Sequence, residues 1–207
     1  MADLNSLKVK VAEMSQTALS MWRVTHQAFM EHDMDLFPGI FENEGKLNNM
    51  QKELVGEFIK LGRDPQMQTK ADLISVYVDI VGDLELIGDY CKDILERVEI
   101  KIEERLLFSE DSVKEYNELY NKAEEALDEV TRALEKDHPA LVKEVLNNQG
   151  HIDTLVDQYR LNHNRRLISG TCTPLGCNMF LNMLDFTAAV YYHTKKIARS
   201  LLKIKNE

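Results

Sequence analysis

One segment of the chain, from Leu73 to Val98, reads LISVYVDIVGDLELIGDYCKDILERV. Its apolar residues recur at alternating intervals of four and three, which is the heptad spacing of a helix with one buried seam. The members of this seam are Leu73, Tyr77, Ile80, Leu84, Ile87, Cys91, Ile94 and Val98. Because Asp64 can cap a helix and Pro65 suits a first turn, the pattern predicts one long helix from Asp64 to Phe108.

Similar apolar spacing recurs on both sides of this segment. The chain holds only 9 Gly and 4 Pro residues, which favours long helices with few turns. Ser109 reads as an N-cap, and Thr173-Pro174 reads as a cap followed by a first turn. The other predicted helices span residues 3–32, 38–62, 109–136 and 139–166, and a last one runs from Thr173-Pro174 to Ile204.

The helical pattern is repeated once along the chain. A shift of about 103 residues lays the seam of the long helix on that of the last helix, with Tyr77 on Phe180 and Ile80 on Met183. A nearly equal shift aligns the second helix with the fifth. The sequence therefore predicts an all-α fold of six long helices, arranged as two tandem antiparallel three-helix bundles with pseudo-twofold symmetry. The predicted domains are residues 1–108 and 109–207.

Composition narrows the class of partner. The formal net charge of −10 repels phosphate backbones and acidic lipid surfaces, so we expect no nucleic-acid partner and no direct membrane insertion, and a metal cation or a basic protein surface suits the chain better. The longest uncharged run, residues 167–184, is interrupted by Gly170 and Pro174 and cannot insert as a membrane span. We expect a cytoplasmic protein, and a tether at the inner face of the membrane stays open.

Most residues with catalytic potential are scattered. The three cysteines lack zinc-finger spacing: Cys91 lies on the seam as a small core residue, while Cys172 and Cys177 flank a turn as spacers or a redox pair. The six histidines are dispersed. A phosphate-binding glycine loop and a nucleophile elbow are both missing from the sequence. An enzyme is therefore the weaker hypothesis.

One group of oxygen-bearing residues stands out. Glu85 and Asp89 lie four residues apart on one side of the long helix, and Glu44 and Asn48 have the same spacing on the preceding helix. If these two helices pack side by side, the four residues converge on one groove. Carboxylates gathered there would repel one another unless a cation such as Mg²⁺, Ca²⁺, Mn²⁺ or iron neutralised them.

A plainer interpretation exists for half of this group. Glu85 and Asp89 can instead belong to a solvated acidic ridge that continues through Asp93 and Glu96 on the same helix. Spacing alone does not distinguish the ridge from the groove.

Two of these motifs resemble those of the PhoU family. Glu44-x-x-x-Asn48 is similar to the family's Glu-x-x-x-Asp, and Asp83-Leu-Glu-Leu-Ile-Gly-Asp89 is similar to its Leu-Glu-Arg-Ile-Gly-Asp. Helix order and duplication resemble the family as well. The segment Arg166–Cys172 looks most like the PhoU-like cytoplasmic domain at the C-terminus of bacterial sodium/phosphate cotransporter-type proteins.

The resemblance implies iron, zinc or another divalent metal bound by the first repeat. Its metal ligands would be Glu44, Glu85 and Asp89, with Asn48 in place of the usual aspartate. In the second repeat, the aligned motifs are degraded and no metal is expected to bind. There Gln149 replaces the glutamate, Asp153 is retained, and Ala188 and Tyr192 replace the acidic pair.

The resemblance also implies a non-enzymatic regulator of phosphate transport or phosphate signalling. The expected partner is a membrane phosphate transporter or a phosphate-signalling protein, and homodimerisation stays open. Two alternatives come from other classes. One is a metal-dependent hydrolase or oxidase that uses the first-repeat carboxylates, and the other is a purely structural helical scaffold.

Overall fold

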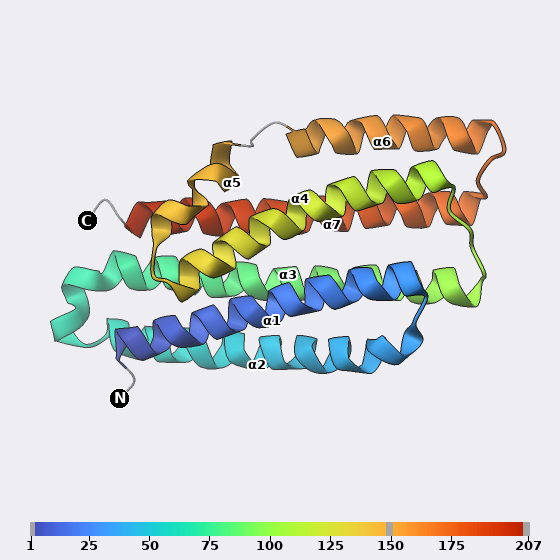
Figure 1. Ribbon diagram of the computed structural model, residues 1–207. Coiled ribbons are helices and arrows are strands. Elements are labelled where there is room, and N and C mark those ends of the chain that lie inside the picture. The colour runs from blue at the N-terminus through green and yellow to red at the C-terminus, as the bar shows by residue number, and fades with distance from the viewer. Residues whose placement is uncertain (1–2, 148–150, 205–207) are drawn as a thin grey trace.

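The structure is a computed structural model that describes residues 3–147 and 151–204. Within these ranges the chain is helical and contains no β-strand. The long helices lie side by side along one common axis, and short connections join them at the two ends (Figure 1). The α-helices are α1 (Leu4–Glu31), α2 (Phe37–Gly62), α3 (Ala71–Glu103), α4 (Glu110–Glu135), α5 (Lys143–Asn147), α6 (His151–Ile168) and α7 (Pro174–Ile204). None of the described helices is long and apolar enough to cross a lipid bilayer.

Two helix starts lie where the sequence predicts them. Ser109 caps α4 by accepting a hydrogen bond from the backbone N–H of Ser112 at 3.2 Å. Thr173 precedes α7, and its hydroxyl accepts a hydrogen bond from the backbone N–H of Gly176 at 3.2 Å. Each cap satisfies an N–H that has no partner inside its helix, so both starts are fixed locally by sequence.

The central helix is shorter than predicted at both ends. Asp64 and Pro65 open a 3₁₀ turn, η2 (Pro65–Lys70), and α3 begins only at Ala71. The Asp64 side chain accepts a hydrogen bond from the backbone N–H of Gln66, a tight local contact that favours the 3₁₀ turn. At the other end α3 stops at Glu103, and Arg105 adopts a left-handed conformation with φ of 50°. The predicted helix from Asp64 to Phe108 is therefore wrong at its two termini.

The fifth predicted helix, over residues 139–166, is divided. Pro139–Val142 forms the 3₁₀ turn η3, α5 ends at Asn147, and α6 begins at His151. Gln149, which the family resemblance places in the second-repeat motif, lies outside the described residues. The prediction of six long helices holds, with α5 as a short additional one.

The core is built around α3. Every member of its predicted seam is buried except Leu73, which is half-buried. Helix α3 packs against α1 and α2 on one side and against α7 on the other, which is why it also buries a second row of side chains. Helix α4 packs against α1 and α7, so one continuous cluster of buried side chains extends through both halves. The division into domains at residue 108 stays a prediction, although it coincides with the connection between α3 and α4.

Candidate functional site

Helices α2 and α3 approach closely at Gly88. A Cβ atom on this residue would lie 2.5 Å from Cδ1 of Leu47, a side chain that is itself fully buried. The absence of a side chain therefore lets α2 and α3 pack tightly at this level. Glu44 and Asn48 flank Leu47 on α2, and Asp89 follows Gly88 on α3. The two predicted motifs thus come from adjacent helices, as expected.

We call the four residues Glu44, Asn48, Glu85 and Asp89 the acidic face. All four side chains are half-buried. Oε1 of Glu44 accepts a hydrogen bond from the amide of Asn48 at 3.1 Å and from Nζ of Lys92 at 3.3 Å. Lys92 of α3 therefore forms an ion pair with the carboxylate of Glu44 on α2.

The two carboxylates of α3, Glu85 and Asp89, both have raised pKa values. Burial raises the pKa of Glu85, and the charges of Asp89 and Glu44 raise it further. Burial likewise raises the pKa of Asp89, again with a contribution from Glu44, while Lys92 acts in the opposite direction. Like charges that raise one another's pKa lie near each other in a medium of reduced polarity. The groove interpretation is therefore favoured over the fully solvated ridge for Glu85 and Asp89.

The donor set of the acidic face fits an oxygen-ligated cation. Oδ1 of Asn48 is fully buried and has no hydrogen-bond partner, so a neutral oxygen donor is available beside three carboxylates. Carboxylate and amide oxygens are the ligands of hard divalent ions. The three carboxylates do not converge on one point in this arrangement, because their ligand atoms are not all within 4.8 Å of one another. The types of donor atom therefore suit a divalent cation, but their positions do not form a preassembled binding site.

The matching positions of the second half carry other chemistry. Asp153 is exposed on α6, Ala188 on α7 has no ligand atom, and Tyr192 is 57% exposed. The acidic pair of α3 has no counterpart on α7, in line with the sequence comparison of the two repeats.

Asp83, the first residue of the quoted motif, has a role that the sequence did not reveal. Its side chain is 1% exposed, and Oδ1 accepts hydrogen bonds from Nδ1 of His193 and Nζ of Lys196, each at 2.9 Å. Both donors belong to α7, so this contact connects the two halves of the chain. Its only sequence signal is an acidic residue on a helix face that turns out to meet α7.

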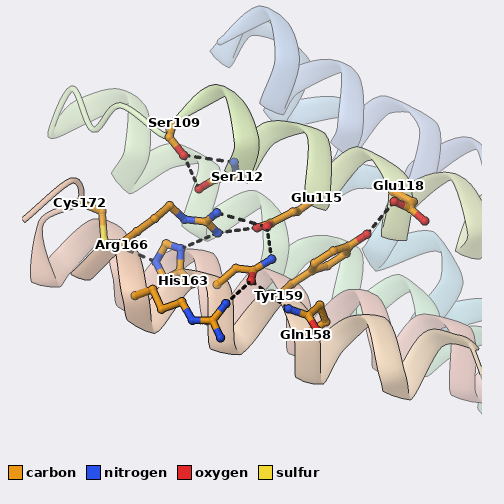
Figure 2. Close-up of polar contacts among 11 residues, drawn as sticks. Ser109, Ser112, Glu115, Glu118, Gln158, Tyr159, His163, Arg166 and Cys172 are labelled. Atoms are coloured by element: carbon orange, nitrogen blue, oxygen red, sulfur yellow. Dashed lines mark hydrogen bonds and ion pairs between the residues drawn. The ribbon is translucent and has the colours of Figure 1, made fainter. Parts of the chain in front are cut away.

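A second group of potential ligands lies at the N-terminal end of α7. His163 on α6, Cys172 in the connection and Cys177 on α7 each offer one ligand atom, and the three atoms lie within 4.8 Å of one another. Figure 2 shows His163 and Cys172 facing each other beside Arg166, whose guanidinium pairs with Glu115 of α4. We call His163, Cys172 and Cys177 the His–Cys cluster. Sequence reasoning noted both cysteines but could not place a histidine beside them, because α6 must first fold back along α7.

The buried histidine of this cluster is neutral. His163 is 1% exposed, and burial together with the charge of Arg166 lowers its pKa to about 4. Its ring stacks on Phe180 with the centroids 4.4 Å apart. A neutral imidazole in a fixed orientation can act as a hydrogen-bond partner or as a metal ligand.

The hollows of the surface lie away from both groups. One, of about 440 Å³, is lined mainly by charged residues of α4 with Arg23 of α1, and Arg23 is paired with Glu124 and Asp128. Another, of about 630 Å³, lies between α1 and the end of α4. Ion pairs already occupy the charged lining of the first hollow, and neither of these two hollows is lined by a residue of the acidic face or of the His–Cys cluster.

Comparisons with known proteins agree on one fold. The PhoU domain family matches residues 11–98. PhoU from Pseudomonas aeruginosa has a solved structure that aligns with a TM-score of 0.90 and 17% identity, over 98% of this chain and 97% of that one. The phosphate transport system regulatory protein PhoU from Streptococcus pneumoniae aligns with a TM-score of 0.85 and 14% identity, over 98% and 94% of the two chains. No curated protein sequence matches.

The family match covers most of α1, all of α2 and most of α3, and it includes the acidic face and Gly88 on α2 and α3. The structural matches extend through α4, α6 and α7, so the second half has the same architecture despite its altered motifs. Residues 11–98 are thus similar to the PhoU domain family, and nearly the whole length of the chain adopts the fold of the solved PhoU structures.

Proposed function

We propose that this protein regulates phosphate transport or phosphate signalling through protein contacts and without catalysis. The observation that carries this proposal is the PhoU domain at residues 11–98, set in a fold shared with a phosphate transport system regulatory protein. The polar groups of the acidic face support a binding role, since they are half-buried beside the close contact of α2 and α3. The expected partner is a membrane phosphate transporter or a phosphate-signalling protein.

The acidic face binds a divalent cation in this proposal. Glu44, Glu85 and Asp89 would hold the ion, with Oδ1 of Asn48 as a neutral donor. The support is the buried, unpartnered amide oxygen together with two carboxylates whose pKa values are raised by their neighbours. A bound cation supplies positive charge that offsets this repulsion and links α2 to α3. Iron and zinc are the ions that the family resemblance implies.

Metal analysis of protein purified without chelator tests the cation site. We expect the wild type to carry a divalent metal and the double variant Glu85→Ala, Asp89→Ala to have lost it. The matched control is Asp93→Ala, Glu96→Ala, which removes two half-buried acidic residues from the next turns of the same helix. Equal metal content in all three proteins would contradict the site.

Crosslinking in cells tests the regulatory role separately. We expect the wild type to recover a membrane phosphate transporter or a phosphate-signalling protein, and the acidic-face double variant to recover less of it. An unrelated acidic helical protein of similar size is the control for non-specific capture. Recovery of no transport or signalling component would contradict the proposal even if the metal is present.

The absence of catalysis is also testable. If the chain were a hydrolase or an oxidase, Glu85→Ala would abolish a turnover that the wild type shows in the presence of its metal. The proposal predicts that Glu85→Ala lowers metal content and partner recovery while leaving no reaction to lose. A turnover that depends on Glu85 in purified protein would contradict it.

A further inference from the structure

The end of the bundle where α6 turns into α7 brings together three side chains that bind soft metals. Sγ of Cys172 lies 3.8 Å from Nε2 of His163, and Sγ of Cys177 completes a group whose members are all within 4.8 Å of one another (Figure 2). Among the described residues, no other group of three His, Cys, Asp or Glu side chains meets this distance. None of the three cysteines is in a disulfide bond, so both sulfur atoms are available.

The surroundings hold these ligands in place. The His163 ring is stacked on Phe180, and its second nitrogen, Nδ1, lies 3.4 Å from the Arg166 guanidinium. Cys177 is buried, and its backbone N–H donates to the carbonyl of Thr173 at 2.8 Å, which fixes the first turn of α7. The three ligands thus come from a helix, a short connection and a capped helix start.

We propose that His163, Cys172 and Cys177 form a zinc site that joins α6 to α7. Thiolate and imidazole ligands favour zinc over magnesium or calcium, and zinc takes them in tetrahedral geometry. Zinc bonds to one sulfur and one imidazole nitrogen place these two atoms about 3.5 Å apart, close to the separation in this structure. The fourth position is left to water or to another ligand.

Binding has a defined proton balance. The Arg166 guanidinium can only donate, so in the metal-free protein Nδ1 of His163 accepts and the ring proton is on Nε2, facing Cys172. When zinc takes the Nε2 lone pair, that proton moves to Nδ1, which then donates, so the Arg166 guanidinium must release its contact with Nδ1. The two thiol protons leave to solvent, so each bound ion releases two protons.

Cobalt provides a direct spectroscopic test with the intact chain. Reduced protein is stripped with a chelator, freed of it, and titrated with Co²⁺, whose bonds to thiolate give charge-transfer absorption in the near ultraviolet. We expect this absorption to saturate at one ion per chain and to disappear when Zn²⁺ is added. We also expect Zn²⁺ to raise the unfolding temperature, and calorimetry in two buffers to report the release of two protons.

Variants assign the signal to these residues. Cys172→Ser, Cys177→Ser should abolish the absorption, and His163→Asn should weaken Co²⁺ binding more than about tenfold. Cys91→Ala is the matched control, because it removes the remaining thiol from the core and leaves the cluster intact. Glu85→Ala, Asp89→Ala should also keep the absorption, so failure of the acidic-face site and failure of this one are distinguishable.

Three results would overturn the proposal. The first is the lack of thiolate absorption in reduced wild type, which needs no variant to fold. The second is equal Co²⁺ binding by wild type and the double cysteine variant when circular dichroism shows equal helix content. The third is a Cys172–Cys177 disulfide formed under mild peroxide while the reduced protein binds no metal. That result would make the pair a redox device instead.

Discussion

The two halves of this protein differ in how far nearby cations compensate their half-buried carboxylates. In the first half, the charges of Asp89 and Glu44 raise the pKa of Glu85, Glu44 also raises the pKa of Asp89, and Lys92 is the one cation among the described residues that bonds to the acidic face. In the second half, Glu115 is paired with Arg166, with side chains only 12% and 13% exposed. The same fold therefore contains one group of carboxylates that a single lysine compensates only in part and one carboxylate that is paired with an arginine.

This difference indicates where an external ligand has something to contribute. A cation that reaches the acidic face removes repulsion between groups that are already partly desolvated. A cation near Glu115 would have to displace the guanidinium of Arg166 and leave it buried without a partner. The second half carries Ala188 and Tyr192 where the first has its acidic pair. We infer that the oxygen-ligated cation belongs to the first half alone, separate from the zinc site that we propose at the His–Cys cluster of the second half.

The largest effect is expected where the halves meet. Asp83→Ala leaves His193 and Lys196 of α7 without their shared acceptor and should lower the free energy of unfolding by about 3 kcal/mol. Asp79→Ala, at an exposed position one turn earlier, should have little effect. Chemical denaturation of both variants measures the difference. Equal losses would show that the contact contributes nothing specific to the association of the halves.

Neutralising Glu115, the carboxylate of the second half that is paired with Arg166, should also destabilise the protein. Glu115→Gln keeps the shape but leaves Arg166 buried without a counter-charge, at a cost of about 2 kcal/mol in unfolding free energy. Glu118→Gln is the control, since Glu118 is exposed and its partner is the hydroxyl of Tyr159 at 2.7 Å. Urea unfolding at neutral pH measures both. A Glu115→Gln protein as stable as wild type would remove one side of the comparison between the halves.

The close approach of α2 and α3 can be tested with two glycines of the same helix. Gly88→Ala places a Cβ against buried Leu47 and should cost about 1 kcal/mol even after the gain in helix propensity. Gly82→Ala, where nothing lies within 4 Å, should stabilise by about 0.5–1 kcal/mol. Thermal unfolding distinguishes the two. If both substitutions stabilise, α2 and α3 are not tightly packed beside the acidic face.

The smallest expected effect concerns Glu85, and its sign is the opposite of the others: removing this charge should stabilise the protein. The pKa of Glu85 is raised above its ordinary 4.5, so the folded state holds its proton more tightly and stability falls as pH rises through that interval. With chelator present, Glu85→Gln should therefore stabilise at neutral pH, by less than about 1 kcal/mol because the group is partly solvated. Below pH 4.5 the gain should vanish, since the wild-type carboxyl is then protonated in both states. Unfolding curves across this range provide the measurement, and a destabilised variant at pH 7 would contradict the repulsion.

Sequence alone predicted the parts of this fold that depend on local pattern. The seams of α3 and α7 follow from heptad spacing, and the starts of α4 and α7 follow from their caps. The acidic face was located because both of its motifs lie on helices that are neighbours in the chain. Only helix order was needed to bring them together.

What the sequence could not provide depends on contacts between distant segments. The role of Asp83 requires knowing that its side of α3 meets α7, and the His–Cys cluster requires α6 to fold back beside the start of α7. Periodicity identifies which face of a helix is buried but not which neighbour buries it.

The most direct test of the acidic face compares wild type with Glu85→Gln, with and without Mn²⁺. With chelator, the variant should be the more stable protein, because repulsion has been removed. At a Mn²⁺ concentration about a hundred times its Kd, the wild type should gain about 2.7 kcal/mol and become the more stable of the two. This reversal of order is the result that we predict. If Mn²⁺ raises both proteins equally, or neither, the acidic face does not bind a cation.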